Sequence, residues 1–199
     1  MKKTPRKPIK SYTPDEGSRY HIQHRNGTEE YCQIRDLSPL IMVGDDIFVK
    51  NSDGSEDLIG IITPNTYARL LTDFAEYAIV NLSRKWDQRT IDTIAVIRKR
   101  LTGETMTQEE LKKAAKQSSF ASNRFHSVDE RGEYCDYIPD YVVADVIYSL
   151  VSNQQLLTPL NQTAFRGDGL QNMEEEERQG LYIISYLSSA EYIFSLGLS

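Results

Sequence analysis

The stretch that most limits the possible folds runs from Asp87 to Phe125, and its pattern predicts two helices joined by a tight turn. The first helix has a mostly apolar face whose members are three or four residues apart: Ile91, Ile94, Ala95, Arg98 and Leu101. Gly103 occupies the position of a left-handed C-cap, and Thr107 with Glu110 has the spacing of a capping box. We therefore expect a helical hairpin in the middle of the chain.

The second helix of this hairpin has a face rich in small residues: Leu111, Ala114, Ala115, Ser118, Ala121, Ser122 and Phe125. Small side chains let two helices approach closely, so the pattern favours a hairpin that packs against another helix. A ligand-binding role would need polar groups that converge between the helices. Only Arg98 and Ser118 could supply them, and packing is the preferred interpretation.

Charge is distributed unevenly along the chain, whose formal net charge is −6. The first ten residues hold five basic side chains and no acidic one: Lys2, Lys3, Arg6, Lys7 and Lys10. The rest of the chain then has 18 basic and 29 acidic side chains, which disfavours nucleic-acid binding outside this arm. Residues 1–18 are predicted to be an extended arm that binds an acidic partner surface, nucleic acid or anionic lipid, or else stays solvated.

The sequence favours a cytoplasmic location. No apolar run reaches the length of a membrane span, and the basic start lacks the apolar region of a secretory signal. The two cysteines, Cys32 and Cys135, fall in separate predicted elements, and we expect ordinary thiols rather than a disulfide.

Two β-hairpins are predicted before the helices. Residues 19–35 alternate around Asn26-Gly27, and the strands that end at Val49 and begin at Leu58 are joined through Asp53-Gly54. His21 and His24 would point to opposite faces of a strand, so we predict no metal site there. The nearby acidic residues are interpreted as turn and edge-protecting charges: Asp45, Asp46, Asp53, Glu56 and Asp57.

Thr63 and Pro64 mark the start of a helix that can run to about Trp86. Its predicted apolar stripe contains Tyr67, Leu70, Leu71, Phe74, Ala78 and Leu82, widened by Ala75, Ile79 and Trp86. Trp86 is interpreted as a core residue, with an aromatic docking site as the alternative.

After Phe125 the chain is polar and acidic and contains several tyrosines. Such a loop suits a protein-binding surface, because tyrosine offers large contact area at low entropic cost. The alternative is a solvated loop whose tyrosines fold back on the core. His126, Cys135 and Asp136 could suggest a nucleophile and a base, but nothing in the sequence fixes their geometry.

The C-terminal third is predicted to be helical around loops. A helix opens at Pro139-Asp140, although the β-branched residues that follow leave a strand as the alternative, and residues 153–172 form a loop or short helices. Glu174 to Glu177 is interpreted as a solvated helix start, with an acidic docking patch as the alternative. Residues 181–187 are expected to be buried on all sides, and Ser188 with Glu191 to cap a last short helix.

The central hairpin carries a further pattern: Asp87, Arg89, Ile94, Arg98, Gly103 and Glu104, then Glu-Glu-Leu-x-x-Ala-Ala from Glu109 to Ala115. Across residues 87–122 the chain resembles helical immunity proteins of bacterial polymorphic-toxin systems. That resemblance implies a protein that binds and blocks a cognate toxin.

These patterns predict an α+β, mostly α-helical protein: a basic arm (1–18), an antiparallel β unit (19–62) and a helical body (63–199), or one domain over 19–199. No catalytic, metal-ligating or cofactor-binding set is found, so we expect a non-enzymatic protein that binds another, basic protein. The candidate contacts are Glu130, Glu133, Tyr134, Asp136, Tyr137, Glu174, Glu175, Glu176 and Glu177, with the five basic residues of the arm. The alternative is a subunit of a phage particle or bacterial complex, anchored by the arm. A third hypothesis, an enzyme whose site is built by the fold, would need a deep pocket that contains a buried carboxylate and His126 or His24.

Overall fold

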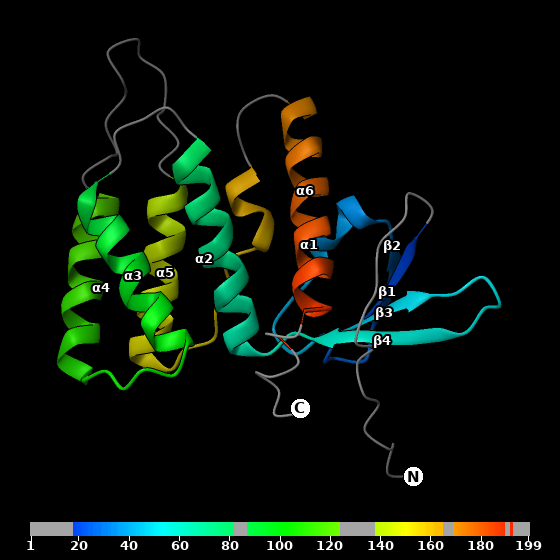
Figure 1. Ribbon diagram of the computed structural model, residues 1–199, viewed down its shortest axis with the longest axis horizontal. Helices are drawn as coiled ribbons and strands as arrows, with labels where there is room; N and C mark the ends of the chain where they lie inside the picture. Colours follow the sequence, from blue (N-terminus) through cyan, green and yellow to red (C-terminus); the bar gives the residue numbers. More distant parts are fainter. Residues whose placement is uncertain (1–17, 82–86, 124–137, 165–168, 190–191, 193–199) are drawn as a thin grey trace. The chain divides into compact units, whose positions relative to one another are not determined.

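The structure, a computed structural model, describes residues 18–81, 87–123, 138–164, 169–189 and 192 (Figure 1). The chain forms two compact units. The first contains residues 1–66 and 168–199, and the second contains residues 67–167. The predicted α+β, mostly helical class is confirmed.

The first unit is built on a four-stranded antiparallel sheet, with strand order β2-β1-β3-β4. Its strands are β1 (Arg19–Gln23), β2 (Glu29–Cys32), β3 (Asp46–Lys50) and β4 (Glu56–Ile61). Both predicted hairpins are confirmed, and Gly27 and Gly54 have φ angles of 88° and 84° in their turns. The return strand is shorter than predicted, because Ile34 and Arg35 belong to the 3-10 helix η1 (Ile34–Asp36). Asp36 accepts a hydrogen bond from the Gln33 amide there, which stops the strand.

The long helix α6 (Gly169–Leu187) completes this unit by packing against β4, η1 and the short helix α1 (Leu37–Leu40). A Cβ on Gly180 would lie 1.9 Å from the Ile34 carbonyl oxygen, so only glycine permits this approach of α6 to η1. The sequence placed residues 63–199 in one helical body, whereas α6 groups with the sheet.

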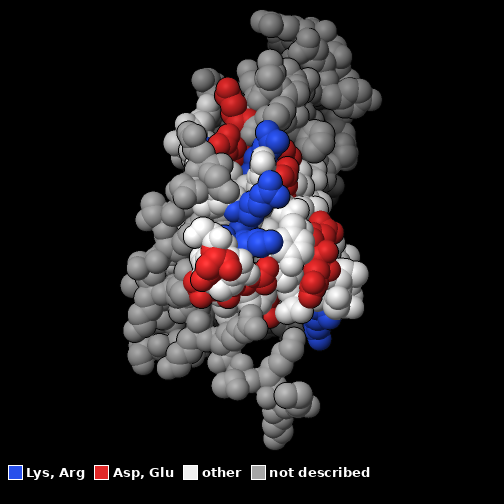
Figure 2. Space-filling model, turned by 90° about the vertical axis from the view of Figure 1, so that its right-hand side faces the viewer, with Lys and Arg blue, Asp and Glu red and all other residues white. Residues whose placement is uncertain are grey.

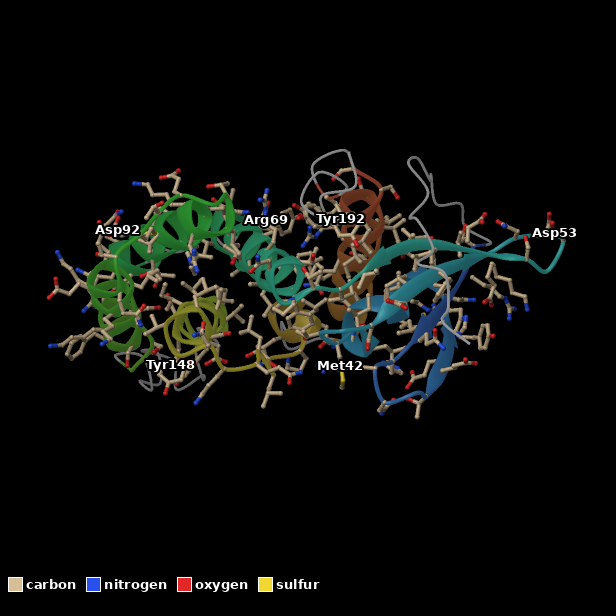
Figure 3. All side chains as sticks on the ribbon, turned by 90° about the horizontal axis from the view of Figure 1, so that it is seen from below. Met42, Asp53, Arg69, Asp92, Tyr148 and Tyr192 are labelled. Carbon is tan, nitrogen blue, oxygen red and sulfur yellow. The ribbon has the colours of Figure 1, made fainter. Side chains whose placement is uncertain are left out.

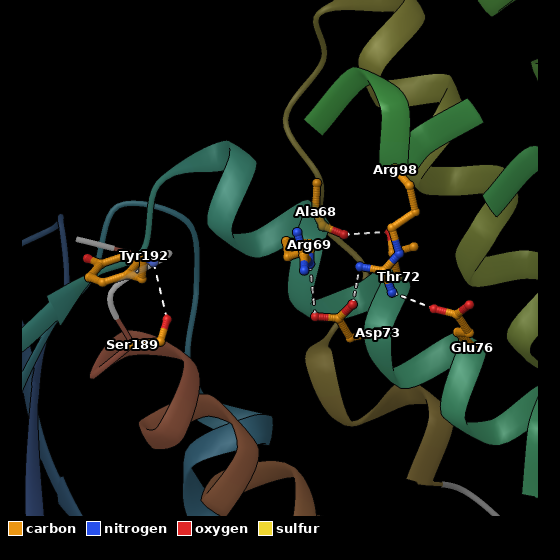
Figure 4. Close-up of polar contacts among 8 residues, drawn as sticks. All are labelled: Ala68, Arg69, Thr72, Asp73, Glu76, Arg98, Ser189 and Tyr192. Atoms are coloured by element: carbon orange, nitrogen blue, oxygen red, sulfur yellow. Dashed lines mark hydrogen bonds and ion pairs between the residues drawn. The ribbon is translucent and has the colours of Figure 1, made fainter. Parts of the chain in front are cut away.

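Three details of α6 correct the sequence analysis. The helix begins at Gly169, so Glu174 to Glu177 lie in its second and third turns and not at its start. Residues 181–187 are buried on one side only, because Leu181 and Ser185 are exposed while Ile183, Ile184 and Leu187 are buried. The amide of Tyr192 donates to the hydroxyl of Ser189 rather than to that of Ser188, and Glu191 lies outside the described residues (Figure 4).

The second unit is helical. It contains most of α2 (Pro64–Asn81), then α3 (Gln88–Leu101), α4 (Gln108–Asn123), α5 (Ile138–Ser152) and the 3-10 helix η2 (Leu160–Ala164). The predicted start of α2 is confirmed, since the Thr66 amide donates to the Thr63 hydroxyl. The core residues predicted for α2 are buried, except that Ile79 is half-buried; Leu82 and Trp86 lie outside the described residues.

The predicted α3–α4 hairpin is confirmed. Gly103 has a φ of 85°, and the amides of Gly103 and Glu104 donate to the carbonyls of Arg100 and Lys99 in a Schellman motif. The capping box is also present, because the Thr107 amide donates to Glu110 and the Glu110 amide donates to the Thr107 hydroxyl. The predicted face of α4 is buried, with Ala115 half-buried and Phe125 outside the described residues.

The predicted face of α3 is wrong in part. Ile91 and Ala95 are exposed, whereas Thr90, Thr93 and Ile97 are buried with Ile94. The threonines can be buried because the Thr93 hydroxyl donates to the Arg89 carbonyl and the Thr90 hydroxyl donates to the Asp140 carboxylate. None of the described helices combines the length and the apolar character that crossing a bilayer requires.

Candidate functional site

The most distinctive surface of the helical unit lies on α5. Tyr141 and Tyr148 are 41% and 56% exposed, and Asp145 lies between them on the same stripe of the helix. Their spacing of four and seven residues places them on one side of the helix. The opposite side is buried and consists of Val142, Val143, Val146 and Ile147. The helix thus buries these four aliphatic residues and leaves both tyrosines exposed; Figure 3 labels Tyr148.

The segment after α5 also exposes an aliphatic side chain. Asn153, with a φ of 54°, ends the helix, and the Thr158 hydroxyl then donates to the Asp145 carboxylate at 2.6 Å. The Tyr67 hydroxyl donates to the Thr158 carbonyl at 2.8 Å. Leu157, the residue before Thr158, is 81% exposed. We call Tyr141, Asp145, Tyr148 and Leu157 the α5 face.

The α5 face has the composition of a protein-binding surface. Tyrosine and exposed aliphatic side chains are enriched at the centres of protein interfaces, and a leucine this exposed gains by being covered. The sequence analysis missed Tyr148 and Leu157, because it read α5 for its buried valines only. The tyrosines seven residues apart, opposite those valines, were the available signal.

Most of the contact residues named from the sequence cannot be placed. Glu130, Glu133, Tyr134, Asp136 and Tyr137 lie outside the described residues, as do the basic arm residues Lys2, Lys3, Arg6, Lys7 and Lys10. The remaining candidates are on α6. Glu174 and Glu177 are exposed, Glu176 is half-buried, and Glu175 is buried and binds Arg178 through both of its carboxylate oxygens. Glu175 therefore stabilises its own helix and does not add a free charge to that surface.

The two histidines of the sheet unit are each held between carboxylates. His21 Nδ1 lies 2.9 Å from Glu56, and its ring stacks between Tyr31 and Phe48 at centroid distances of 4.5 and 5.4 Å. His24 Nδ1 lies 3.0 Å from Asp45, and its Nε2 lies 3.5 Å from Glu30. Both rings are thus tied to neighbouring elements of the unit.

The surroundings of Asp45 and Glu56 contradict the interpretation of these acidic residues as turn and edge-protecting charges. Asp45 is buried and accepts hydrogen bonds from His24 and from the Met42 amide. Glu56 is half-buried against His21. Asp53 does act in its turn, because it accepts from the amide and the hydroxyl of Ser55, and these bonds lower the pKa of its carboxyl.

A buried carboxyl lies inside the helical unit. Asp140, in the first turn of α5, accepts a hydrogen bond from Thr90 through Oδ1, while Oδ2 contacts no donor in the described part of the chain. Burial raises the pKa of the Asp140 carboxyl, and the hydrogen bond from Thr90 opposes that shift.

A second network joins α2 to α3, where Arg98 binds Asp73 and Glu76, and Arg69 also binds Asp73 (Figure 4).

The described parts of the chain contain possible metal ligands and one cysteine, Cys32. Across residues 18–81, 87–123, 138–164 and 169–189, no group of three or more His, Cys, Asp or Glu side chains could hold a metal ion. Cys32 is a free, buried cysteine, and burial raises the pKa of its thiol to about 12, with Asp36 and Glu30 adding to the shift. At neutral pH this thiol stays protonated and is a poor nucleophile. Cys135 lies outside the described residues.

Charge on the surface is mixed. On the side of the molecule drawn in Figure 2, a line of basic side chains runs between groups of acidic ones. That surface therefore offers no single acidic field. Comparisons of this chain with protein-family models, with curated proteins and with solved structures find no match.

Proposed function

We propose that this chain acts by binding another protein, without catalysing a reaction, and that the α5 face is the contact. The observation that carries the proposal is the exposure of Tyr148, on α5, and of Leu157, in the segment that the Asp145–Thr158 bond ties to α5, at 56% and 81%. Rigid aromatic and aliphatic anchors are the residues on which interface affinity usually depends.

The acidic loop before α5 extends the proposed contact. Tyr137 directly precedes Ile138, the first residue of α5, so the loop candidates are joined by a few residues of chain to Tyr141. Glu130, Glu133 and Asp136 would attract a basic partner, and acidic residues around an apolar centre raise association rates with such a partner.

Neutralisation of a cognate toxin in a bacterial cytoplasm is the specific form of this proposal. It rests on the resemblance of residues 87–122 to immunity proteins, and a nuclease toxin would supply the required basic surface, since such enzymes bind phosphate backbones. Assembly into a larger particle through the basic arm is the competing role, and the experiment below separates the two.

The test is affinity capture from native lysate with four forms of the full chain. These are the wild type, the double variant Tyr148→Ala/Leu157→Ser, a form lacking residues 1–18, and Met42→Ala as a control with an exposed apolar side chain of the sheet unit. A stoichiometric partner should be retained by the control and the shortened form and lost by the double variant. A partner lost only with residues 1–18 would contradict the proposal and favour assembly.

Binding is then measured with the purified partner by titration calorimetry. Loss of two anchors at an interface centre should weaken the affinity by about a hundredfold. Equal affinities for the wild type and the double variant would show that the α5 face is not the contact.

A further inference from the structure

The outer side of α3 exposes two apolar residues. Ile91 is 41% exposed and Ala95 is also exposed, while the helix buries Thr90, Thr93, Ile94 and Ile97 on its other side. An exposed isoleucine gains by being covered, so the outer side of α3 is a candidate contact surface.

The exposed stripe of α3 is continuous. We call it the α3 face, and it consists of residues three or four apart: Gln88, Ile91, Asp92, Ala95 and Lys99. On α2, Val80 is 75% exposed and Tyr77 is also exposed. The contact of Arg98 with Glu76 aligns the two antiparallel helices, so Tyr77 and Val80 lie toward the half of α3 that contains Ile91.

The order of charges on the α3 face indicates which partner would cover it. Asp92 lies one turn before Ala95, and Lys99 lies one turn after it, while the central residue is small. A helix face with an acidic residue, a small residue and a basic residue in this order is complementary to the same face of a second copy that runs antiparallel to it. Each Asp92 then faces a Lys99, and the alanines allow the helices to approach closely.

We propose that two copies of this chain associate through the α3 face, with the two α3 helices antiparallel about a two-fold axis near Ala95. Asp92 of each copy then pairs with the partner subunit's Lys99, and Ile91, Tyr77 and Val80 are covered beside that pair. The contact uses residues other than those of the α5 face, so its test is independent of the proposed binding function.

The first test is charge reversal with rescue, measured on the full chain by sedimentation velocity over a range of concentrations. Asp92→Lys would place two lysines opposite each other at both symmetry-related contacts of the dimer, and Lys99→Asp would place two aspartates there. Each substitution should therefore weaken association about tenfold or more. The double variant restores opposite charges and should recover the dimer. All four proteins should have the same circular dichroism spectrum, because both side chains are exposed.

Two outcomes would overturn the proposal. One is a wild-type chain that sediments as a monomer at every concentration. The other is a double variant that remains as weakened as the two single variants, because antiparallel pairing of Asp92 with Lys99 requires rescue.

A crosslinking experiment tests the position of the axis. Ala95→Cys in a Cys135→Ser background should form a disulfide-linked dimer under mild oxidation, since a two-fold axis near residue 95 brings the two Cα atoms within disulfide range. Cys32 is buried and stays out of the reaction. Ser119→Cys, exposed on α4, is the matched control and should not crosslink. Equal crosslinking of the two variants would contradict the proposed geometry.

Discussion

The two units of this protein differ in how many large apolar side chains they expose. The sheet unit holds its core with close contacts between distant parts of the chain, such as Gly180 on Ile34 and Tyr192 on Ile61. Both units bury polar groups as well as apolar ones, for example Asp45 in the sheet unit and Asp140 in the helical unit. Of the ten large apolar side chains exposed among the described residues, seven belong to the helical unit.

The sheet unit depends on close contacts in its core, so substitutions at those positions should be costly. In the helical unit, Ser118 and Asp140 are buried with incomplete hydrogen bonding among the described residues, so substitutions there should cost little or even stabilise. We therefore expect the largest losses of stability in the sheet unit.

Replacing Gly180 with alanine should destabilise the sheet unit most. The new Cβ would lie 1.9 Å from the Ile34 carbonyl oxygen, so α6 or η1 must move. We expect a loss of about 3 kcal/mol in the free energy of unfolding, measured by urea denaturation followed by circular dichroism. Gly54→Ala is the control, since its Cβ would meet no atom within 4 Å and should cost only about 1 kcal/mol for the left-handed backbone. Equal losses would show that the contact at Gly180 is not close.

Replacing Tyr192 with phenylalanine should have the next largest effect. The buried Tyr192 hydroxyl accepts from the Ile61 amide at 2.6 Å and donates to the Ile61 carbonyl at 2.9 Å, in place of a neighbouring strand at this edge of β4. Its loss leaves both backbone groups without that partner, so we expect a destabilisation of about 1–2 kcal/mol.

The same substitution should change the alkaline stability. Burial raises the pKa of Tyr192 to about 12. Stability from this group is therefore complete below its unfolded pKa of about 10 and is lost as the pH rises toward 12. Denaturation as a function of pH should show a smaller alkaline loss for Tyr192→Phe. An unchanged alkaline loss would mean that this hydroxyl is solvated.

In the helical unit, Asp140→Asn should stabilise at neutral pH. Burial raises the pKa of Asp140, so its contribution is fully present below the unfolded pKa and is lost as the pH rises through the folded one. Asparagine keeps an acceptor for Thr90 without the charge. Thermal unfolding at several pH values should show the two proteins alike in acid and the variant more stable near neutrality. A variant that is less stable at every pH would show that the carboxylate is needed.

The smallest effect is expected at Ser118, whose hydroxyl is buried without a hydrogen-bond partner among the described residues. Ser118→Ala should raise the free energy of unfolding by about 0.5–1 kcal/mol, from relief of desolvation and better helix propensity. Ser119→Ala, exposed on the next residue, gains propensity alone and should give the smaller increase. A loss of stability at Ser118 would mean that the hydroxyl is satisfied.

The sequence predicted what depends on local chemistry. The Asn26-Gly27 turn, the Thr63 cap, the capping box at Thr107 and the left-handed Gly103 all follow from residues within a few positions of one another. These interactions close inside one element or turn, so neighbouring residues suffice to recognise them.

Contacts between residues far apart in the chain could not be predicted from the sequence. Nothing near Gly180 shows that it packs on Ile34, and so the return of α6 to the sheet unit was missed. The burial of Thr90 depends on Asp140, fifty residues away, and without that bond the apolar pattern of α3 indicated a different face. On the α5 face, the spacing of Tyr141 and Tyr148 was visible in the sequence, whereas the bond of Thr158 to Asp145, next to Leu157 and across the end of the helix, was not.

Hydrogen–deuterium exchange of the full chain, with and without the captured partner, tests most directly whether the helical unit is the binding part. We predict slower exchange in residues 138–158 of the complex, with the sheet strands β1 to β4 unchanged. Protection confined to the sheet strands, with residues 138–158 exchanging as in the free protein, would contradict it.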